Sequence, residues 1–326
     1  MTDVTHKRLL LIDGMNNFLR SYVVNPSLDA NGSHVGGMVG FINSMKKAIS
    51  ETKPDAVIVA WEGANGSRRR KEINKNYKAG RKPPRLNREY EFSAEEEAEN
   101  KLQQLIMLIE YLEKLPVLQM SLDDVEADDI IAWAVKSNHY ADYQKIIFSN
   151  DKDFLQLCDD QTILYRPTTK KVHNKNSILE EFKIHPRNFA IAKAIAGDKS
   201  DNIIGAPRVG LATVAKRFPF LAEDKDYILQ NIFDFCQEKN EESKKPPQVY
   251  NSVLECSGTL KDNYDIVQLY EPMISLQGQQ RLSEAVAGFT PELRKNDFRM
   301  SLMKHGISGI GVDNLFQACM SIVVNK

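Results

Sequence analysis

Short apolar runs alternate with helical patterns along the first half of the chain, and this alternation constrains the fold most strongly. We expect strands near residues 7–12, 55–61, 116–120, 145–149 and 162–165. Helical spacing at residues 36–50, 102–114 and 126–136 separates most of them. Such alternation predicts βαβ units and an α/β fold with a mostly parallel sheet covered by helices on both faces. Ligand sites of these sheets lie at the carboxyl ends of the strands.

Acidic side chains follow four of the expected strands. They are Asp13, Glu62, Glu126, Asp128, Asp129, Asp151 and Asp153, and two further acids, Asp198 and Asp201, lie in a turn between later helices. In a parallel sheet the first seven carboxylates project onto one edge, where like charges raise one another's pKa. Mg²⁺ or Mn²⁺ relieves this repulsion, because hard divalent cations take carboxylate and water oxygens as ligands. Two such ions about 4 Å apart support phosphodiester hydrolysis.

Each acid alone also has an ordinary structural explanation. Asp13-Gly14 is typical of a turn, acids at residues 126–129 complement a helix dipole, and Asp151 and Asp153 suit a helix N-cap region. Only the joint pattern favours a metal site. The sequence offers no Ser-His-Asp or Cys-His arrangement, and its six His and four dispersed Cys lack metal-ligand spacing. The cysteines are expected to be reduced thiols in a cytosolic protein.

The overall charge conceals a strongly basic segment. The chain has 43 Lys and Arg against 44 Asp and Glu, a balance that taken alone argues against a nucleic-acid binder. Residues 67–88, however, contain one acidic and ten basic residues, whereas residues 89–99 contain six Glu and no Lys or Arg. The bases are Arg68, Arg69, Arg70, Lys71, Lys75, Lys78, Arg81, Lys82, Arg85 and Arg88. With Tyr77 among them, they predict phosphate contacts and base stacking in a basic cover over the acidic edge. A solvated charged loop or helix stays an alternative.

A glycine-containing turn is expected between two helices at residues 197–218. Gly205 and Gly210 flank this turn, and residues 211–217 have a helical pattern. Glycines allow backbone N–H groups to approach phosphate oxygens. Nearby positive charge comes from Arg208, Lys216 and Arg217. An ordinary helix–turn–helix packing unit explains the same pattern, so both interpretations stay open.

Five motifs, in order, resemble those of the 5′-nuclease family. They are LLLIDGMNNFLRSY (9–22), YKAGR (77–81), VEADDIIA (125–132), SNDKDFLQL (149–157) and GDKSDNIIGAPRVGLATVAK (197–216). The family includes bacteriophage 5′–3′ exonucleases and RNase H-type enzymes, flap endonucleases and the 5′-nuclease domain of bacterial DNA polymerase I. The resemblance implies a PIN-like nuclease core at residues 1–175, with a helical arch at about 67–100. It also implies a helical region at 176–326, with a helix–three-turn–helix DNA clamp at about 190–220 and a C-terminal extension.

The resemblance also assigns roles to single residues. It makes metal ligands or their supports of Asp13, Glu126, Asp128, Asp129, Asp151, Asp153, Asp198 and Asp201. Glu126, Asp128 and Asp151 are expected nearest one ion, with Asp153, Asp198 and Asp201 nearer the other. Lys78, Lys193 and Arg20 match positively charged active-site residues, and Tyr77 matches a stacking position. In the family, the helix–three-turn–helix DNA clamp often holds K⁺. Glu62 departs from the usual aspartate after the second strand, although its longer side chain could still reach a metal directly or through water.

The resemblance and the residues together predict a Mg²⁺-dependent, structure-specific 5′ nuclease, a 5′–3′ exonuclease or flap endonuclease acting in replication. Its expected partners are branched or 5′-ended DNA, with RNA–DNA hybrids, RNA primers and replication proteins as further candidates. A monomer without a membrane span is expected, in bacterial cytoplasm or in host cytoplasm if the chain is phage-encoded. Two alternatives stay open: a non-catalytic branched-DNA-binding protein of the same fold, and a PIN-class ribonuclease.

Overall fold

The computed structural model describes residues 7–81, 85 and 93–324, which form two compact units. The first unit draws on the ranges Met1–Gly63, Pro83–Asn150 and Ile274–Lys326. The second draws on Ala64–Lys82 and Asp151–Met273. Each unit is therefore assembled from separated parts of the sequence. The expected division at residue 175 stays a prediction.

Four parallel strands form the centre of the first unit, in the order β3-β2-β1-β4. They are β1 (Arg8–Asp13), β2 (Ala56–Ala60), β3 (Leu118–Met120) and β4 (Gln144–Phe148). Residues 9–12 of β1 are fully buried, as expected for a parallel strand covered on both faces. The register places Asp13 opposite Ala60 and Ile12 opposite Phe148. The carboxyl ends of these strands therefore meet at one edge, as the sequence predicts.

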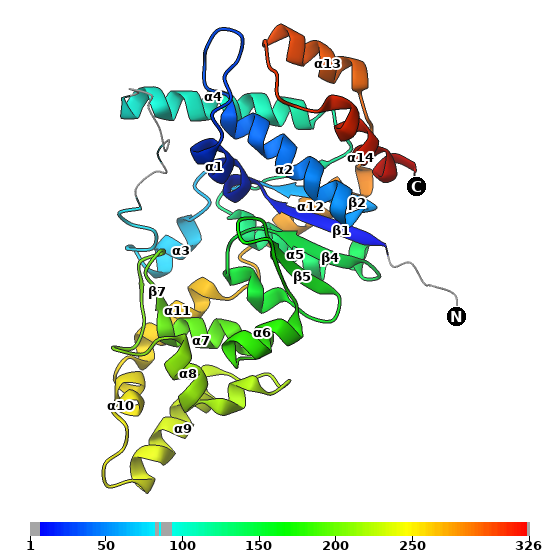
Figure 1. The fold of residues 1–326 in the computed structure, drawn as a ribbon. Helices are drawn as coiled ribbons and strands as arrows, with labels where there is room; N and C mark the ends of the chain where they lie inside the picture. Colours follow the sequence, from blue (N-terminus) through cyan, green and yellow to red (C-terminus); the bar gives the residue numbers. More distant parts are fainter. Residues whose placement is uncertain (1–6, 82–84, 86–92, 325–326) are drawn as a thin grey trace, which may run out of the picture. The chain divides into compact units, whose positions relative to one another are not determined.

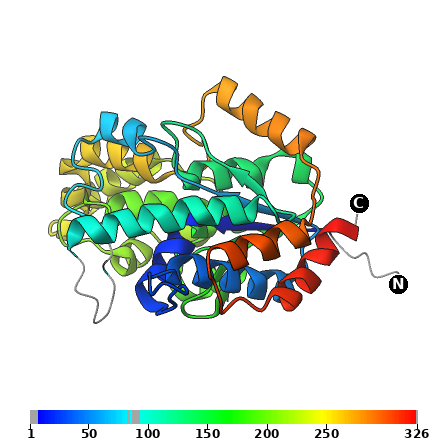
Figure 2. The same cartoon turned by 90° about the horizontal axis from the view of Figure 1, so that it is seen from above.

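Helices of the first unit pack around these strands. They are α1 (Gly14–Val24), α2 (Gly36–Thr52), α4 (Ala94–Leu112), α5 (Ala127–Lys136), α12 (Leu276–Gly288), α13 (Lys295–Lys304) and α14 (Val312–Val324), with the 3₁₀ turn η1 (Asn138–Tyr140). Figure 1 shows α1, α2, α4, α13 and α14 on one side of the parallel strands. Figure 2 shows α13 beside α4, where the rings of Phe298 and Tyr111 are in edge contact.

The second unit is mainly helical and contains two short hairpins. Its helices are α3 (Arg68–Ile73), α6 (Lys175–Phe182), α7 (Phe189–Ala196), α8 (Leu211–Arg217), α9 (Leu229–Glu242), α10 (Gln248–Glu255) and α11 (Ser257–Val267), with 3₁₀ turns η2 (Asp153–Leu157), η3 (Pro186–Asn188) and η4 (Pro219–Ala222). Strands β5 (Thr162–Arg166) and β6 (Lys171–His173) form one antiparallel hairpin, and β7 (Gly197–Asp198) and β8 (Ile203–Ile204) form the other.

The highly charged stretch contains helix α3 and the start of helix α4. Helix α4 begins at Ala94, eight residues before the expected start, because Ser93 and Glu96 form a reciprocal capping box. Residues 82–84 and 86–92 of the expected arch, including the bases Lys82 and Arg88, lie outside the described residues. Among the helices that the structure describes, none is both long and apolar enough to cross a membrane. All four cysteines are free thiols.

Candidate functional site

Asp13 lies at the carboxyl end of β1 and is buried there. Its carboxylate accepts a hydrogen bond from the Ser149 hydroxyl at 2.8 Å and caps α1 by accepting the Asn16 N–H at 3.1 Å. Ser149 directly follows β4, which pairs with β1. The expected turn at Asp13-Gly14 is therefore a helix start. The carboxylate is fixed in place by the strand that carries it and by the neighbouring strand's loop.

Three further acids of the first unit begin helix α5. Glu126 is the N-cap residue and is 2% exposed, whereas Asp129 is fully buried and Asp128 is half-buried. Glu62 follows β2 but is exposed. Beside it, Gly63 approaches the chain so closely that an added Cβ would lie 1.7 Å from the Leu122 carbonyl oxygen. The structure thus separates an exposed Glu62 from the buried acids of this unit.

In the second unit, Lys193 joins two of the predicted carboxylates. Its ammonium donates to Asp198 at 2.8 Å and to Asp153, and Lys193 itself is 6% exposed. Asp151 accepts the backbone N–H of Asp153 at 2.8 Å, which fixes the start of η2. Ser200 donates its hydroxyl and its N–H to Asp198 at 2.6 and 2.8 Å. Two stretches of chain, residues 151–153 and 193–198, thus form one charged cluster in which Lys193 is buried and the three carboxylates are half-buried.

The electrostatics of this cluster depend on burial and on the Lys193 charge. Burial and the charge of Asp151 raise the pKa of the Asp153 carboxyl. Burial would also raise the pKa of Asp198, but the ammonium of Lys193 and the hydrogen bonds from Ser200 lower it to about 2. Burial disfavours the charged form of Lys193, yet the two carboxylates raise its pKa. Lys193 therefore stays protonated and balances the negative charge.

Asp201 connects the basic segment to this part of the chain. The guanidinium of Arg81 forms an ion pair with the Asp201 carboxylate and donates to the Ser200 carbonyl at 3.0 Å. The backbone N–H of Lys78 donates to the Asp201 carbonyl at 2.9 Å. Burial raises the pKa of Asp201, and the Arg81 charge opposes that shift. These contacts hold residues 76–81 against the turn that carries Asp198 and Asp201.

Two members of the expected DNA-binding set are buried. Tyr77 is 3% exposed and packs in an apolar cluster with Ile266 and Val267, and its stacking role stays a prediction. Arg70 is buried, and its Nε donates to the Ile266 carbonyl at 2.9 Å. Both side chains therefore contact the stretch of chain that contains Ile266 and Val267. By contrast, Arg68 and Arg81 are exposed, while Arg69 and Lys78 are half-buried.

The predicted glycine turn follows β8. Gly205 packs against backbone, since an added Cβ would lie 2.3 Å from the Ala196 carbonyl carbon. Gly210 has open space where a Cβ would be and is the N-cap residue of α8. The nearby bases Arg208 and Lys216 are exposed. The region thus offers open space at Gly210 and exposed positive charge at Arg208 and Lys216.

Arg20 lies on helix α1 in the first unit, and its side chain reaches α2. Its guanidinium donates to the Asn17 side-chain oxygen at 2.7 Å and to the Ser44 hydroxyl at 2.8 Å. These contacts are structural in character. The role that the resemblance implies for Arg20 stays a prediction.

The predicted carboxylates are divided between the units. Asp13, Glu62, Glu126, Asp128 and Asp129 belong to the first, whereas Asp151, Asp153, Asp198 and Asp201 belong to the second. Within the described ranges, no three His, Cys, Asp or Glu side chains are grouped as a metal site. The donor chemistry nevertheless fits a hard divalent cation, because it consists of carboxylates held at strand ends and helix starts. Convergence of both sets on one site stays a prediction.

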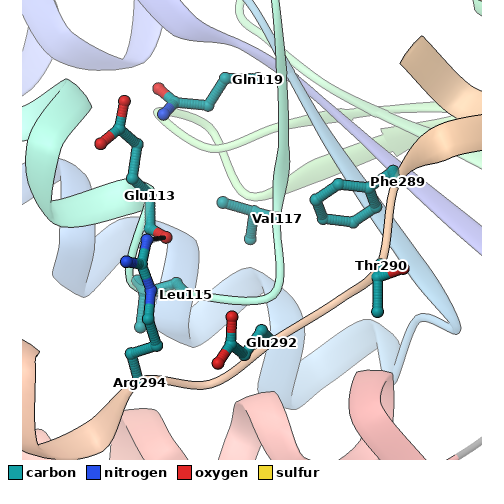
Figure 3. A pocket seen from close by; sticks show the side chains of 8 residues that line it. All are labelled: Glu113, Leu115, Val117, Gln119, Phe289, Thr290, Glu292 and Arg294. Carbon is teal, nitrogen blue, oxygen red and sulfur yellow. Dashed lines mark hydrogen bonds between the residues drawn. The ribbon is translucent and has the colours of Figure 1, made fainter.

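A pocket of about 410 Å³ in the first unit lies apart from the sequence motifs. It is lined by Glu113, Leu115, Val117, Gln119, Phe289, Thr290, Glu292 and Arg294, which Figure 3 shows on two facing stretches of chain. The Arg294 backbone N–H donates to the Lys114 carbonyl at 3.0 Å, tying these stretches together. None of its lining residues belongs to the predicted carboxylate or basic sets. The candidate site is therefore not this pocket.

Sequence reasoning missed several polar side chains that hold the predicted residues. Ser149 and Ser200 lie inside recognised motifs and donate to Asp13 and Asp198, so their proximity to the acids was a usable signal. Gln156 donates to the Asp153 carbonyl at 2.8 Å. Asn263 donates to the Ala194 carbonyl at 3.1 Å, from a region without a motif, and no local pattern could have indicated it.

Comparisons with known proteins place part of the chain in a family. Residues 8–183, more than half of the chain, match the family described as "5′-3′ exonuclease, N-terminal resolvase-like domain". DNA polymerase I of Bacillus subtilis is 29% identical over 217 residues, covering 64% of this chain and 23% of the polymerase. A 5′-3′ exonuclease of Buchnera aphidicola is 26% identical over 209 residues, covering 64% of this chain and 68% of the relative. The chain thus spans about a quarter of the polymerase's length.

A solved structure supports the same fold over nearly the whole chain. The bacteriophage T5 flap endonuclease, in a complex with DNA and metal ions, superimposes with a TM-score of 0.63 at 18% identity. The superposition covers 91% of this chain and 98% of the T5 protein. This likeness establishes a PIN-like α/β fold. With the family match over residues 8–183, it follows that the chain belongs to the 5′–3′ exonuclease family.

Proposed function

We propose that the chain is a divalent-metal-dependent, structure-specific 5′ nuclease that hydrolyses phosphodiesters at DNA 5′ ends and flaps. The observation that carries the proposal is the cluster in which the buried Lys193 contacts the half-buried Asp153 and Asp198. Buried charges of this kind are costly to maintain and concentrate at functional sites. The names of the relatives, exonucleases and a flap endonuclease, agree with this chemistry.

Carboxylates of both units would hold the metal ions. The proposed ligands are Glu126, Asp128 and Asp151 near one ion and Asp153, Asp198 and Asp201 near the other. Asp13 and Asp129 are proposed as further ligands or supports. When bound, divalent cations supply an activated water and stabilise the charge of the leaving oxygen. Mg²⁺ is the proposed ion, with Mn²⁺ as a substitute. Glu62, which is exposed, is proposed to reach a metal through water.

Basic groups would bind and orient the phosphate. Lys193 is buried beside two carboxylates, so it carries a fixed positive charge where negative charge develops during cleavage. The Lys78 backbone is held by Asp201, which limits the positions that its ammonium can reach. Gly205 to Lys216 would bind duplex phosphates, with K⁺ as an additional proposed ion. We also propose RNA–DNA hybrids as substrates and a monomer as the active state.

The proposal is tested with a 5′-labelled flap DNA and purified full-length chain. Cleavage near the flap junction is expected with Mg²⁺, none with EDTA, and full recovery when excess Mg²⁺ is returned. Single-stranded RNA and an RNA–DNA hybrid run in parallel. Binding without cleavage in Mg²⁺ and in Mn²⁺ would support the non-catalytic alternative, and cleavage confined to single-stranded RNA would support the ribonuclease alternative.

Salt dependence tests the proposed basic contacts. Flap-DNA affinity is expected to fall linearly with salt on a logarithmic scale, because Lys and Arg release counterions from phosphates. The exposed Lys216→Gln substitution should reduce that slope by about 1. Lys304→Gln, a matched change on the exposed surface of α13, should leave the slope unchanged. Affinity that does not respond to salt would contradict the proposed basic surface.

A further inference from the structure

One short stretch of the second unit contacts three separate segments that carry proposed site residues. We propose that this stretch, residues 263–270 at and just beyond the end of α11, positions Asp153, Lys193, Asp198 and Lys78 for cleavage. We call it the α11 clamp, and it is distinct from the predicted DNA clamp. It lies beyond residues 8–183, which match the family. The inference rests on the nuclease function proposed above. It gives a positioning role to part of the chain that carries no recognised motif.

The first contact fixes the segment that carries Lys193 and Asp198. Asn263 is 1% exposed, and its Nδ2 donates to the Ala194 carbonyl at 3.1 Å and to the Ile204 carbonyl at 2.9 Å. Ala194 directly follows Lys193, and β8 pairs with β7, which contains Asp198. One amide therefore joins the last turn of α7 to the hairpin, and it sets the spacing between the two charged residues.

The second contact fixes η2, which begins at Asp153. Gln156 is 3% exposed, and its Nε2 donates to the Asp153 carbonyl at 2.8 Å and to the Val267 carbonyl at 2.9 Å. Its Oε1 accepts the Leu269 N–H at 2.8 Å. The Tyr270 hydroxyl lies 3.3 Å from the Gln156 carbonyl and donates to the nearer Arg187 carbonyl at 2.7 Å. The clamp therefore holds the Gln156 amide in one orientation, and this amide supports the Asp153 backbone.

The third contact fixes the start of the basic segment. Arg70 donates to the Ile266 carbonyl, and Tyr77 packs against Ile266 and Val267 in a buried apolar cluster. Tyr77 directly precedes Lys78, whose backbone N–H is held by Asp201. The clamp thus anchors the chain immediately before the lysine proposed to orient the phosphate.

These contacts have a kinetic consequence. Removing the Asn263 amide leaves the buried Ala194 carbonyl and the part-buried Ile204 carbonyl without this donor, so the hairpin and the end of α7 are expected to shift. A displacement of about 1 Å between reacting groups can lower a rate about 100-fold. Exposed groups that bind DNA, such as Lys216, do not contact Asn263 through any of these bonds. The clamp should therefore affect kcat far more than KM.

The test compares Asn263→Ala with Asn251→Ala, an exposed asparagine of α10 whose partner is the Asn240 side chain. At a temperature where both variants keep wild-type circular dichroism, Asn263→Ala is expected to lower kcat on flap DNA about 10- to 100-fold, with KM within about threefold. In the metal-free protein, amide hydrogen exchange should accelerate in residues 194–205 and stay unchanged in residues 229–242. Asn251→Ala should change neither quantity.

A wild-type kcat in folded Asn263→Ala, or a raised KM with unchanged kcat, would overturn the inference. If Asn263→Ala does not fold, Gln156→Leu carries the same test, with faster exchange expected in residues 153–158. Inactivity of the wild-type chain on every DNA and hybrid substrate would instead refute the proposed function. The two failures are thus distinguishable in one experiment.

Discussion

Asp153→Asn and Asp198→Asn are each expected to reduce Mg²⁺-dependent cleavage of flap DNA by about 100- to 1,000-fold. Asparagine keeps the shape of the side chain but removes the charge that a divalent cation requires. It also breaks the balance with Lys193, which contacts both carboxylates. The measurement is single-turnover cleavage at saturating enzyme, so that the loss reports chemistry and not binding.

DNA affinity gives the second half of this prediction. Loss of a negative charge does not weaken attraction to phosphate, so the dissociation constant in EDTA should stay the same or fall. Asp234→Asn is the matched control, because Asp234 is exposed on α9 and hydrogen-bonds Gln230. It should cleave at the wild-type rate. Undiminished cleavage by both Asp153→Asn and Asp198→Asn would refute the proposed mechanism.

Periodicity predicted the buried strands well, because parallel strands covered on both faces are continuous apolar runs. All five expected strands are present, from β1 to β5. Strand β6 was missed because two of its three residues are exposed and its pairing depends on β5. The two-residue strands β7 and β8 were missed because they are set by hairpin geometry within a turn and not by a side-chain pattern.

Two helix starts show where local chemistry outweighed periodicity. Helix α1 begins where Asp13-Gly14 indicated a turn, because the Asp13 carboxylate caps it. Helix α4 begins within a run of glutamates, eight residues before the start expected from the apolar spacing. In both cases one side chain satisfies a backbone N–H that an extended chain would expose to water. Capping residues were therefore better guides to these boundaries than hydropathy.

The sequence predicts those contacts of the site that join residues close together in the chain, but not those that join residues far apart. The contact between Lys193 and Asp198 spans five residues and follows from helix and turn geometry. Burial of Arg70 depends on Ile266, which lies 196 residues later in a stretch without a motif. A basic run therefore does not reveal which of its members face solvent. For the same reason, the sequence around Tyr77 does not reveal that its ring packs with Ile266 and Val267.

Lys193→Met is expected to destabilise the metal-free protein by about 3–5 kcal/mol, the range seen when one partner of a buried ion pair is removed. Lys193 is 6% exposed, and methionine keeps most of its apolar stem but not the ammonium. Asp153 and Asp198 would then face one another without a compensating charge. Urea unfolding in EDTA, followed by far-UV circular dichroism, measures the change.

Added Mg²⁺ separates this electrostatic account from a simple packing defect. A cation that binds the folded chain stabilises it by mass action, and this gain grows when a competing ammonium is absent. The Mg²⁺-induced rise in Tm should therefore be larger for Lys193→Met than for the wild-type chain. Lys239→Met is the control: Lys239 pairs with Glu242 on the surface of α9, where solvent screens the charges, so its stability should match the wild type. An equal Mg²⁺-induced rise in Tm in Lys193→Met and the wild type would contradict the expectation that the Lys193 ammonium and Mg²⁺ compete for the same carboxylates.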